Sequence, residues 1–187
     1  KILIANRGEI ACRIIRTCQS LGVSTVAVYS EADRDALHVR LADDAFHIGQ
    51  ATPEDSYLNH ERILETAIRC QADAIHPGYG FLAENDVFAE ACLSKGINFI
   101  GPRPESIREM GSKSRAKQIM QEAGVPVVPG YHGDKQDFKI LRNEAEKIGF
   151  PLLIKPVAGG GGRGMRVVRQ LNELEEALTL SRSEAKN

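Results

Sequence analysis

Short apolar runs rich in β-branched residues alternate with longer segments of helical periodicity in the first part of the chain. The runs are residues 2–5, 25–29, 74–76 and 97–100. Between the first two runs, apolar residues recur at helical spacing and stop at Gly22, a typical helix-ending residue. Strands that alternate with helices in this way form a parallel sheet. The sequence therefore predicts an α/β fold that opens with a Rossmann-like domain over residues 1–110.

Prolines and glycines separate this domain from the rest of the chain. They cluster at residues 101–104 and again at 125–130, where the prolines exclude a central strand. We predict that residues 111–130 form a connecting helix and a linker. Residues 131–187 then hold too few strands and helices to bury both faces of a sheet, so they are predicted to be an incomplete second domain.

The last helix of this second part has a predicted start and a predicted buried face. Asn172 and Glu175 match the spacing of a capping box, so the helix is expected to begin after Asn172. Leu174 and Leu178 are expected to point inward, with Leu180 as a further candidate.

A glycine-rich run joins two short apolar strands, and it is the most informative feature for function. It consists of Gly159, Gly160, Gly161, Gly162, Arg163 and Gly164. Residues without Cβ let consecutive backbone N–H groups surround phosphate oxygens, and the arginine adds a positive charge. A flexible linker is the alternative, but linkers join independent units, whereas this run joins neighbouring strands as a hairpin loop does. Because it matches neither GxxxxGK[ST] nor GxGxxG, the run predicts a phosphate-binding flap.

Two lysines are candidate phosphate contacts. Lys155 ends the strand that enters the glycine run, where alternate side chains point toward the same cleft. Lys113 lies in the first turn of its predicted helix, where a positive charge costs about 0.3–1 kcal/mol against the helix dipole unless an anion binds there. A solvated surface lysine is the alternative interpretation for each.

Two strand-to-helix turns in the first domain are candidate ligand contacts. Residues 76–85 follow a predicted strand, at the sheet edge where open α/β folds bind ligands, and include Tyr79 and Glu84. An equally good interpretation is a structural loop in which Glu84 and Asn85 cap the next helix. The turn at residues 6–9 lacks the glycines of a dinucleotide fingerprint, and its Arg7 and Glu9 are expected to pair locally.

Composition excludes several classes of function. The formal net charge of −1 gives no basic face for nucleic acid, which favours a small nucleotide as ligand. No apolar run is long enough to span a membrane. The five histidines show no metal-ligand spacing, so no metal is assigned to this chain. The four cysteines show no CxxC spacing and are expected to be reduced, buried thiols.

The motifs at residues 4–11, 76–85, 110–113 and 159–165 together resemble the biotin carboxylase family of ATP-grasp enzymes in both order and spacing. The loop at residues 76–85 distinguishes the chain from carbamoyl phosphate synthetases and purine-pathway enzymes. Residues 125–133, Val-Pro-Val-Val-Pro-Gly-Tyr-His-Gly, look like the α subunits of methylcrotonoyl-CoA carboxylases and related acyl-CoA carboxylases.

The resemblance implies a site and a reaction. Residues 131–187 would be part of an ATP-grasp lid, and Lys113, Lys155 and the glycine run would contact ATP. Tyr79 and Glu84 would lie in the loop on the biotin side of the cleft. In this family bicarbonate attacks the γ-phosphate of ATP, and the resulting carboxyphosphate supplies CO2 to N1 of biotin, with Mg2+ stabilising the transferring group.

The resemblance also implies partners for the intact protein and an absence of activity in these 187 residues alone. A biotin carboxyl carrier domain, a carboxyltransferase subunit and a homo-oligomer of the intact subunit are expected. A bacterial cytoplasm is favoured over the mitochondrial matrix, and the acyl-CoA acceptor stays open. The family's magnesium ligands and catalytic residues lie downstream, so the 187 residues alone are expected to be inactive.

Two other classes of function remain as rivals. A non-catalytic nucleotide-binding or assembly module would bind ATP without turnover. A nicotinamide-dependent dehydrogenase would need GxGxxG at the first turn, where residues 6–9 read Asn-Arg-Gly-Glu.

Overall fold

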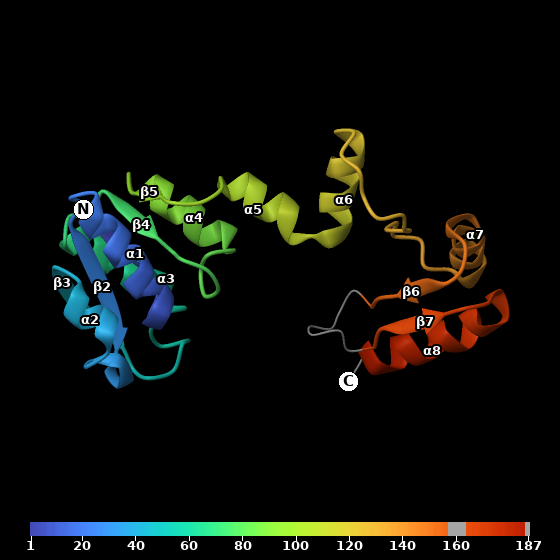
Figure 1. Ribbon diagram of the computed structural model, residues 1–187, viewed down its shortest axis with the longest axis horizontal. Helices are drawn as coiled ribbons and strands as arrows, with labels where there is room; N and C mark the ends of the chain where they lie inside the picture. Colours follow the sequence, from blue (N-terminus) through green and yellow to red (C-terminus); the bar gives the residue numbers. More distant parts are fainter. Residues whose placement is uncertain (157–163, 186–187) are drawn as a thin grey trace. The chain divides into compact units, whose positions relative to one another are not determined.

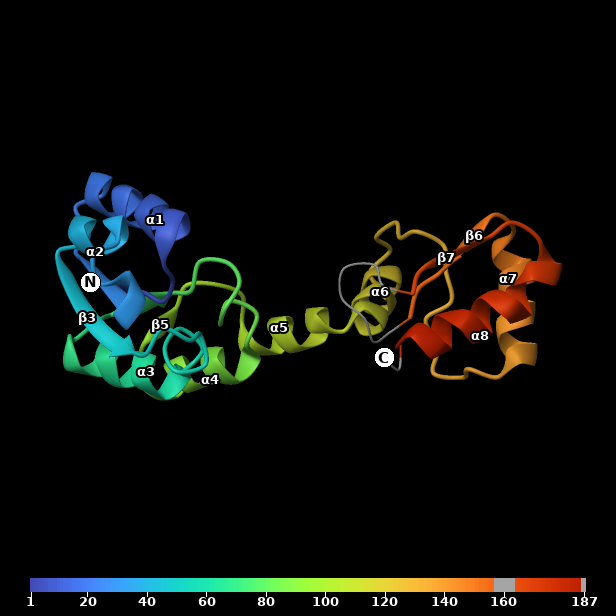
Figure 2. The same cartoon turned by 90° about the horizontal axis from the view of Figure 1, so that it is seen from below.

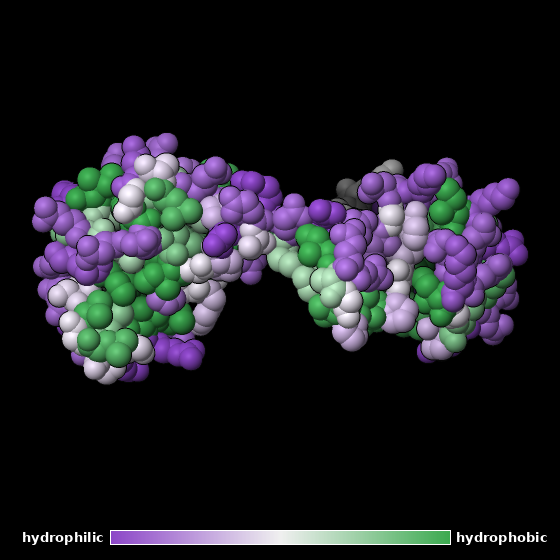
Figure 3. All heavy atoms as spheres, turned by 90° about the horizontal axis from the view of Figure 1, so that it is seen from above, coloured by the Kyte–Doolittle hydropathy of each residue, from purple (hydrophilic) through white to green (hydrophobic). Residues whose placement is uncertain are grey.

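The computed structural model describes residues 1–156 and 164–185 of the chain. It divides into two compact units, Lys1–Ser112 and Lys113–Asn187, which are visible in Figure 1. Large apolar side chains remain exposed in each unit, and Figure 3 shows part of this apolar surface.

The first unit alternates strands and helices along its whole length (Figure 1). Its elements are β1 (Ile2–Ile4), α1 (Gly8–Ser20), β2 (Thr25–Ser30), the 3-10 turn η1 (Glu31–Asp33), α2 (Leu37–Leu41), β3 (Asp44–Gly49), α3 (His60–Arg69), β4 (Ala74–His76), α4 (Asp86–Ser94), β5 (Asn98–Phe99) and α5 (Pro104–Gly111). The strands form a five-stranded sheet in the order β3-β2-β1-β4-β5, and every neighbouring pair is parallel. This confirms the predicted α/β class with a parallel sheet.

The central strands of this sheet are buried on both faces. Leu3 and Ala5 point into a core that includes residues of α3 and α4, such as Ile63 and Phe88. Ile4, between them in the sequence, points to the other face and packs against α1. Because strand side chains alternate, one strand serves both cores. Figure 2 shows α1 and α2 on one side of the sheet and α3 and α4 on the other.

The sequence pattern did not predict the edge strand β3. Its first four residues are exposed or half-buried, and only Ile48 and Gly49 are fully buried. An edge strand that covers little of the core keeps polar residues such as Asp44 and His47, so it lacks the apolar signal by which the other strands were found.

The second unit is a hairpin backed by helices. Its elements are α6 (Lys113–Glu122), α7 (Phe138–Ile148), β6 (Leu152–Ile154), β7 (Arg166–Val168), the 3-10 turn η2 (Leu171–Glu173) and α8 (Leu174–Ala185). Residues 125–137, between α6 and α7, contain neither helix nor strand. β6 and β7 are antiparallel, with Leu153 opposite Val167. The glycine-rich run therefore connects two paired strands, as its sequence context predicts.

The last helix differs from its prediction in two details. Asn172 lies inside η2 and α8 begins only at Leu174, so the capping box does not form; instead the Glu173 carboxylate accepts a hydrogen bond from Arg169 N at 2.8 Å. Leu174 is buried and Leu178 packs beside it, but Leu180 is 41% exposed. Position 180 is off the stripe that Leu174 defines, whereas position 181, seven residues on, falls on it.

The cysteines behave as predicted. Cys12, Cys18, Cys70 and Cys92 are all free and buried. Burial raises the pKa of the Cys92 thiol to about 12, which keeps it protonated and unreactive at neutral pH.

Candidate functional site

In the first unit, the place where an open α/β fold would have its ligand crevice lies at the carboxyl ends of β1 and β4. These strands are neighbours, while β2 lies on the other side of β1. The strand order therefore reverses direction between them, and open α/β folds bind ligands at such a switch point. Asn6 and Arg7 follow β1, and residues 77–81 follow β4.

The chain itself fills this position. Asn6 is 3% exposed, and its Nδ2 donates to Pro77 O at 2.8 Å and to Tyr79 O at 2.9 Å. Its Oδ1 accepts a hydrogen bond from Arg7 N at 2.9 Å. A Cβ on Gly78 would lie 2.9 Å from Asn6 Nδ2, so the two turns are in close contact. A dinucleotide pyrophosphate would have to displace these bonds, which argues against the dehydrogenase alternative.

Arg7 also contacts this loop, through Phe81. Its guanidinium lies 5.4 Å from the ring centroid of Tyr57 and 5.8 Å from that of Phe81, within cation–π range. Its Nη1 lies 3.1 Å from Asp33 Oδ2. The expected local pairing with Glu9 is therefore wrong: the Glu9 carboxylate instead accepts a hydrogen bond from the Tyr79 hydroxyl at 3.2 Å. Arg7 has extended backbone before α1, so the two side chains diverge.

Asp33 is the centre of a hydrogen-bonded cluster. Its carboxylate accepts hydrogen bonds from Tyr57 Oη at 2.8 Å, Ser30 Oγ at 2.9 Å and Arg7 Nη1 at 3.1 Å. Burial alone would raise the pKa of Asp33, but these donors together lower it below its ordinary value. Burial and the neighbouring carboxylate raise the pKa of the Tyr57 hydroxyl, which therefore stays protonated. The cluster therefore ties together the segments that carry Arg7, Ser30, Asp33 and Tyr57.

The predicted substrate-side residues lie in the loop that Asn6 and Arg7 hold. Tyr79 is 63% exposed, and Glu84 is exposed as well. The helix cap expected in this loop is Asn85, whose side chain accepts a hydrogen bond from Phe88 N at 2.8 Å. Tyr79 is thus presented to solvent by a loop that is otherwise anchored.

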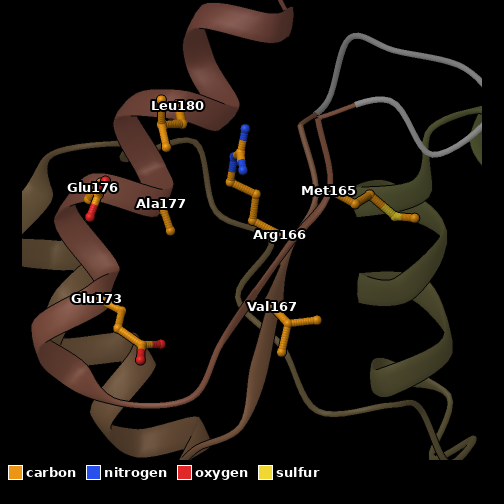
Figure 4. Close-up of a pocket in the computed structure, with 7 residues that line it drawn as sticks. All are labelled: Met165, Arg166, Val167, Glu173, Glu176, Ala177 and Leu180. Carbon is orange, nitrogen blue, oxygen red and sulfur yellow. The ribbon is translucent and has the colours of Figure 1, made fainter.

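The hairpin of the second unit has one covered and one open face. Val168 and Leu174 belong to a core cluster that Leu152 and Ile154 join. The alternate residues Leu153 and Val167 are 45% and 55% exposed, and Lys155 and Met165 are exposed too. Figure 4 shows Met165 and Val167 pointing away from α8, whereas Arg166 points toward it. An apolar strip with a lysine at its end is therefore open to a ligand.

The predicted phosphate contacts are only partly described. Gly159, Gly160, Gly161, Gly162 and Arg163 lie outside the described residues. Gly164 is described and has a φ of +73°, a conformation that favours glycine. Lys155 follows β6 on the same side as Leu153.

Lys113 is the first residue of α6, and its side chain is exposed. The first turn of α6 contains no acidic residue, so the positive end of the helix dipole is not offset within that turn. The phosphate contact expected there stays a prediction.

A hollow of about 330 Å³ lies beside this hairpin, between β7 and α8 (Figure 4). Arg166, Glu173 and Glu176 give it a charged lining, so it suits an apolar ring less well than the open face does. Within residues 1–156 and 164–185, no group of three or more His, Cys, Asp or Glu side chains could hold a metal ion. The described residues therefore do not fit a magnesium site of their own.

None of the described helices has the length and apolar character needed to cross a membrane.

Comparison with known proteins agrees with this division of the chain. The family model described as biotin carboxylase, N-terminal domain, matches residues 1–107, and the one described as carbamoyl-phosphate synthase L chain, ATP binding domain, matches residues 112–187. A parallel front sheet followed by a segment that matches an ATP-binding domain model defines an α/β protein of the ATP-grasp class. Within that class, the chain belongs to the biotin carboxylase family.

Individual relatives are similar over the whole chain. The methylcrotonoyl-CoA carboxylase subunit alpha, mitochondrial, of Mus musculus is 58% identical over 186 residues, which cover 100% of this chain and 26% of that protein. A solved biotin carboxylase–β,γ-ATP complex from Campylobacter jejuni has a TM-score of 0.86 and 50% identity, over 98% of this chain and 41% of that one.

A third relative is the biotin carboxylase domain dimer of the Hydrogenobacter thermophilus 2-oxoglutarate carboxylase, solved with MgADP, ADP and bicarbonate. Its TM-score is 0.83 at 52% identity, over 98% of this chain and 40% of that one. The chain thus spans about a quarter of the methylcrotonoyl-CoA carboxylase subunit and about two fifths of the two solved relatives.

Sequence reasoning missed the residues that brace these loops. Asn6, Arg7 and Asp33 act through contacts between segments up to 73 residues apart, which periodicity does not reveal. One signal was present: Asn6 is a polar residue that follows the apolar run at residues 2–5, where a buried polar side chain must find partners.

Proposed function

We propose that this chain forms the front part of a biotin carboxylase and that its second unit supplies part of the ATP site. The observation that carries the proposal is the open face of the β6–β7 hairpin, where Leu153 and Val167 are exposed and Lys155 directly follows β6, on the way to the glycine-rich run. Such an apolar strip suits an adenine ring, and the lysine suits the phosphates.

The assignment of site residues follows from this proposal. Lys113, Lys155 and residues 159–164 would hold the phosphates of ATP, and Tyr79 with Glu84 would lie on the biotin side. Residues 1–110 would be the front domain, 111–130 a connecting helix and linker, and 131–187 part of the lid. Homologous structures solved with a β,γ-ATP compound and with MgADP and bicarbonate support ATP and bicarbonate as substrates.

The complete protein would carboxylate biotin through carboxyphosphate, as the first half-reaction of an acyl-CoA carboxylase. Its expected partners are a biotin carboxyl carrier domain and a carboxyltransferase subunit, and the dimeric relative supports a homo-oligomer. Magnesium and the reacting groups would be held by residues that this chain does not contain. Relatives named as mitochondrial and relatives from bacteria are both similar, and we favour the bacterial cytoplasm.

Calorimetric titration with Mg-ATP tests the ATP site. We expect saturable binding by the chain and no binding of NAD, because the front crevice is closed. Lys155→Ala should weaken ATP binding about tenfold or more, since a charge-assisted contact is lost. Lys139→Ala, which removes an exposed lysine from α7, is the matched control and should bind ATP normally. Binding of NAD in place of ATP would contradict the proposal.

A further inference from the structure

The buried stripe of α8 contains one polar residue where its spacing calls for an apolar one. Leu174, Ala177 and Ser181 are 2%, 9% and 2% exposed, at intervals of three and four residues. A buried hydroxyl is unfavourable unless it is hydrogen-bonded. Ser181 must therefore have a specific partner at this position.

That partner is the glycine that ends the glycine-rich run. Ser181 Oγ donates to Gly164 O at 2.9 Å, a bond between residues 17 apart in the chain. Serine and threonine in helices usually bond a carbonyl of their own helix, as Thr179 Oγ1 does with Glu175 O at 2.9 Å. Ser181 instead donates its hydroxyl proton across to the hairpin.

The surroundings of Gly164 make this a tight junction. Gly164 has a positive φ, and a Cβ there would lie 3.1 Å from Pro156 Cγ and 3.5 Å from Ser181 O. The two stems of the hairpin loop, at Pro156 and at Gly164, therefore lie close to each other, and Gly164 lies against α8. One turn further along the same helix face, Glu184 forms an ion pair with Arg166.

These contacts fix which way β7 faces. Gly164 and Arg166 are bound to α8, so the alternation of strand side chains directs Met165 and Val167 to the open face. The same two contacts hold the backbone at the point where the glycine-rich run enters β7.

We propose that Ser181 is a positioning residue for the proposed phosphate contacts: its hydroxyl holds Gly164 beside Pro156, and thereby the stem of the hairpin that carries Lys155. This inference rests on the proposed ATP site and deepens it. Ser181 does not touch the nucleotide. Its removal should weaken the binding of the phosphates and leave the binding of the adenosine moiety on the open face unchanged.

The test compares Ser181→Thr with Ser181→Val, because the two side chains have nearly the same shape and only threonine keeps the hydroxyl. Mg-ATP and adenosine are titrated into each variant, with NMR detection of weak binding. We expect Ser181→Thr to bind ATP like the unsubstituted chain and Ser181→Val to bind it roughly fivefold more weakly, the effect of one lost hydrogen bond, with adenosine affinity equal in both. Thr179→Ala, which removes a hydroxyl bonded only within α8, should change neither affinity.

The outcomes separate the two proposals. If the unsubstituted chain binds no ATP, the proposed function fails, and the role of Ser181 fails with it. If the unsubstituted chain binds ATP but the threonine and valine variants bind it equally, or if valine weakens adenosine as much as ATP, the ATP site stands and the positioning role of Ser181 is overturned.

Discussion

The sheets of the two units differ in whether both faces or only one face is buried. In residues 1–112 the central strands of the sheet are buried on both faces, and the position where open α/β folds bind ligands is filled by Asn6 and the loop at residues 77–81. In residues 113–187 the hairpin is covered on one face, and the other exposes Leu153 and Val167. Neighbouring apolar side chains exposed on one face of a sheet can mark a binding surface. This difference supports our proposal that the nucleotide binds in the second unit and that the first unit has a supporting role.

The largest effect should come from the core of the first unit. Phe88 is fully buried and packs edge-on against Phe99, with ring centroids 6.0 Å apart. Phe88→Ala should lower the free energy of unfolding of this unit by about 3–5 kcal/mol, because it removes a large buried ring and leaves a cavity. Amide exchange should accelerate in residues 1–112 and stay unchanged in residues 113–187. Equal acceleration in both units would show that they unfold as one.

Removal of the Asn6 side chain, which fills the crevice, should have a smaller and more local effect on stability. Asn6→Ala removes both hydrogen bonds to the loop carbonyls of Pro77 and Tyr79 and should cost about 1–3 kcal/mol, since buried carbonyls lose their donors. Amide exchange of residues 78–82 should accelerate more than that of the sheet. Asn98→Ala, which removes a side-chain bond to Asp73 O at an exposed position, is the control and should leave the loop unchanged.

The Asp33 cluster should make the first unit sensitive to acid. Because the pKa of Asp33 is lowered from an ordinary value of 3.8, its contribution to stability is present above that value and is lost as pH falls through the folded pKa. Thermal unfolding of the unsubstituted chain should therefore lose stability below about pH 4 more steeply than that of Asp33→Asn. Identical pH profiles for the two proteins would remove Asp33 as the cause.

The smallest effect should come from the open face. Val167 and Val168 are neighbours on β7, but Val168 is fully buried and Val167 is 55% exposed. Val167→Ala should change the unfolding free energy by no more than about 0.5 kcal/mol, as surface substitutions do. Val168→Ala should cost roughly 1–3 kcal/mol, because it leaves a cavity. Denaturant titration of both variants measures the difference, and a large loss for Val167→Ala would mean that this face is covered.

The sequence predicted those parts of the fold that repeat a pattern. The central strands carry uninterrupted apolar runs, and the glycine-rich run lies between two apolar segments, so both were found from local signals. β3 was missed because an edge strand that buries only its last two residues has little apolar signal. Leu180 was expected to point inward, because leucine favours burial, but the helical period places Ser181 there.

The sequence indicated which residues could form the candidate site, but not the hydrogen bonds and ion pairs that hold the surrounding segments in place. Lys155 and the glycine run are local features, and the resemblance to a family gave them a role. The Arg7–Asp33 pair joins residues 26 apart, and the Ser181–Gly164 bond joins residues 17 apart. Such partners depend on how the strands and helices pack, which no spacing rule in the sequence specifies.

The most direct test of nucleotide binding on the open face of the hairpin is to map the Mg-ATP site on the isotope-labelled chain by NMR. We expect the amide signals of Leu153, Lys155, Met165 and Val167 to shift with increasing ATP, while those of Asn6, Arg7 and Gly78 stay in place. Shifts confined to Asn6, Arg7 and Gly78 would contradict this expectation, because they would place the nucleotide in the crevice that the chain fills with its own side chains.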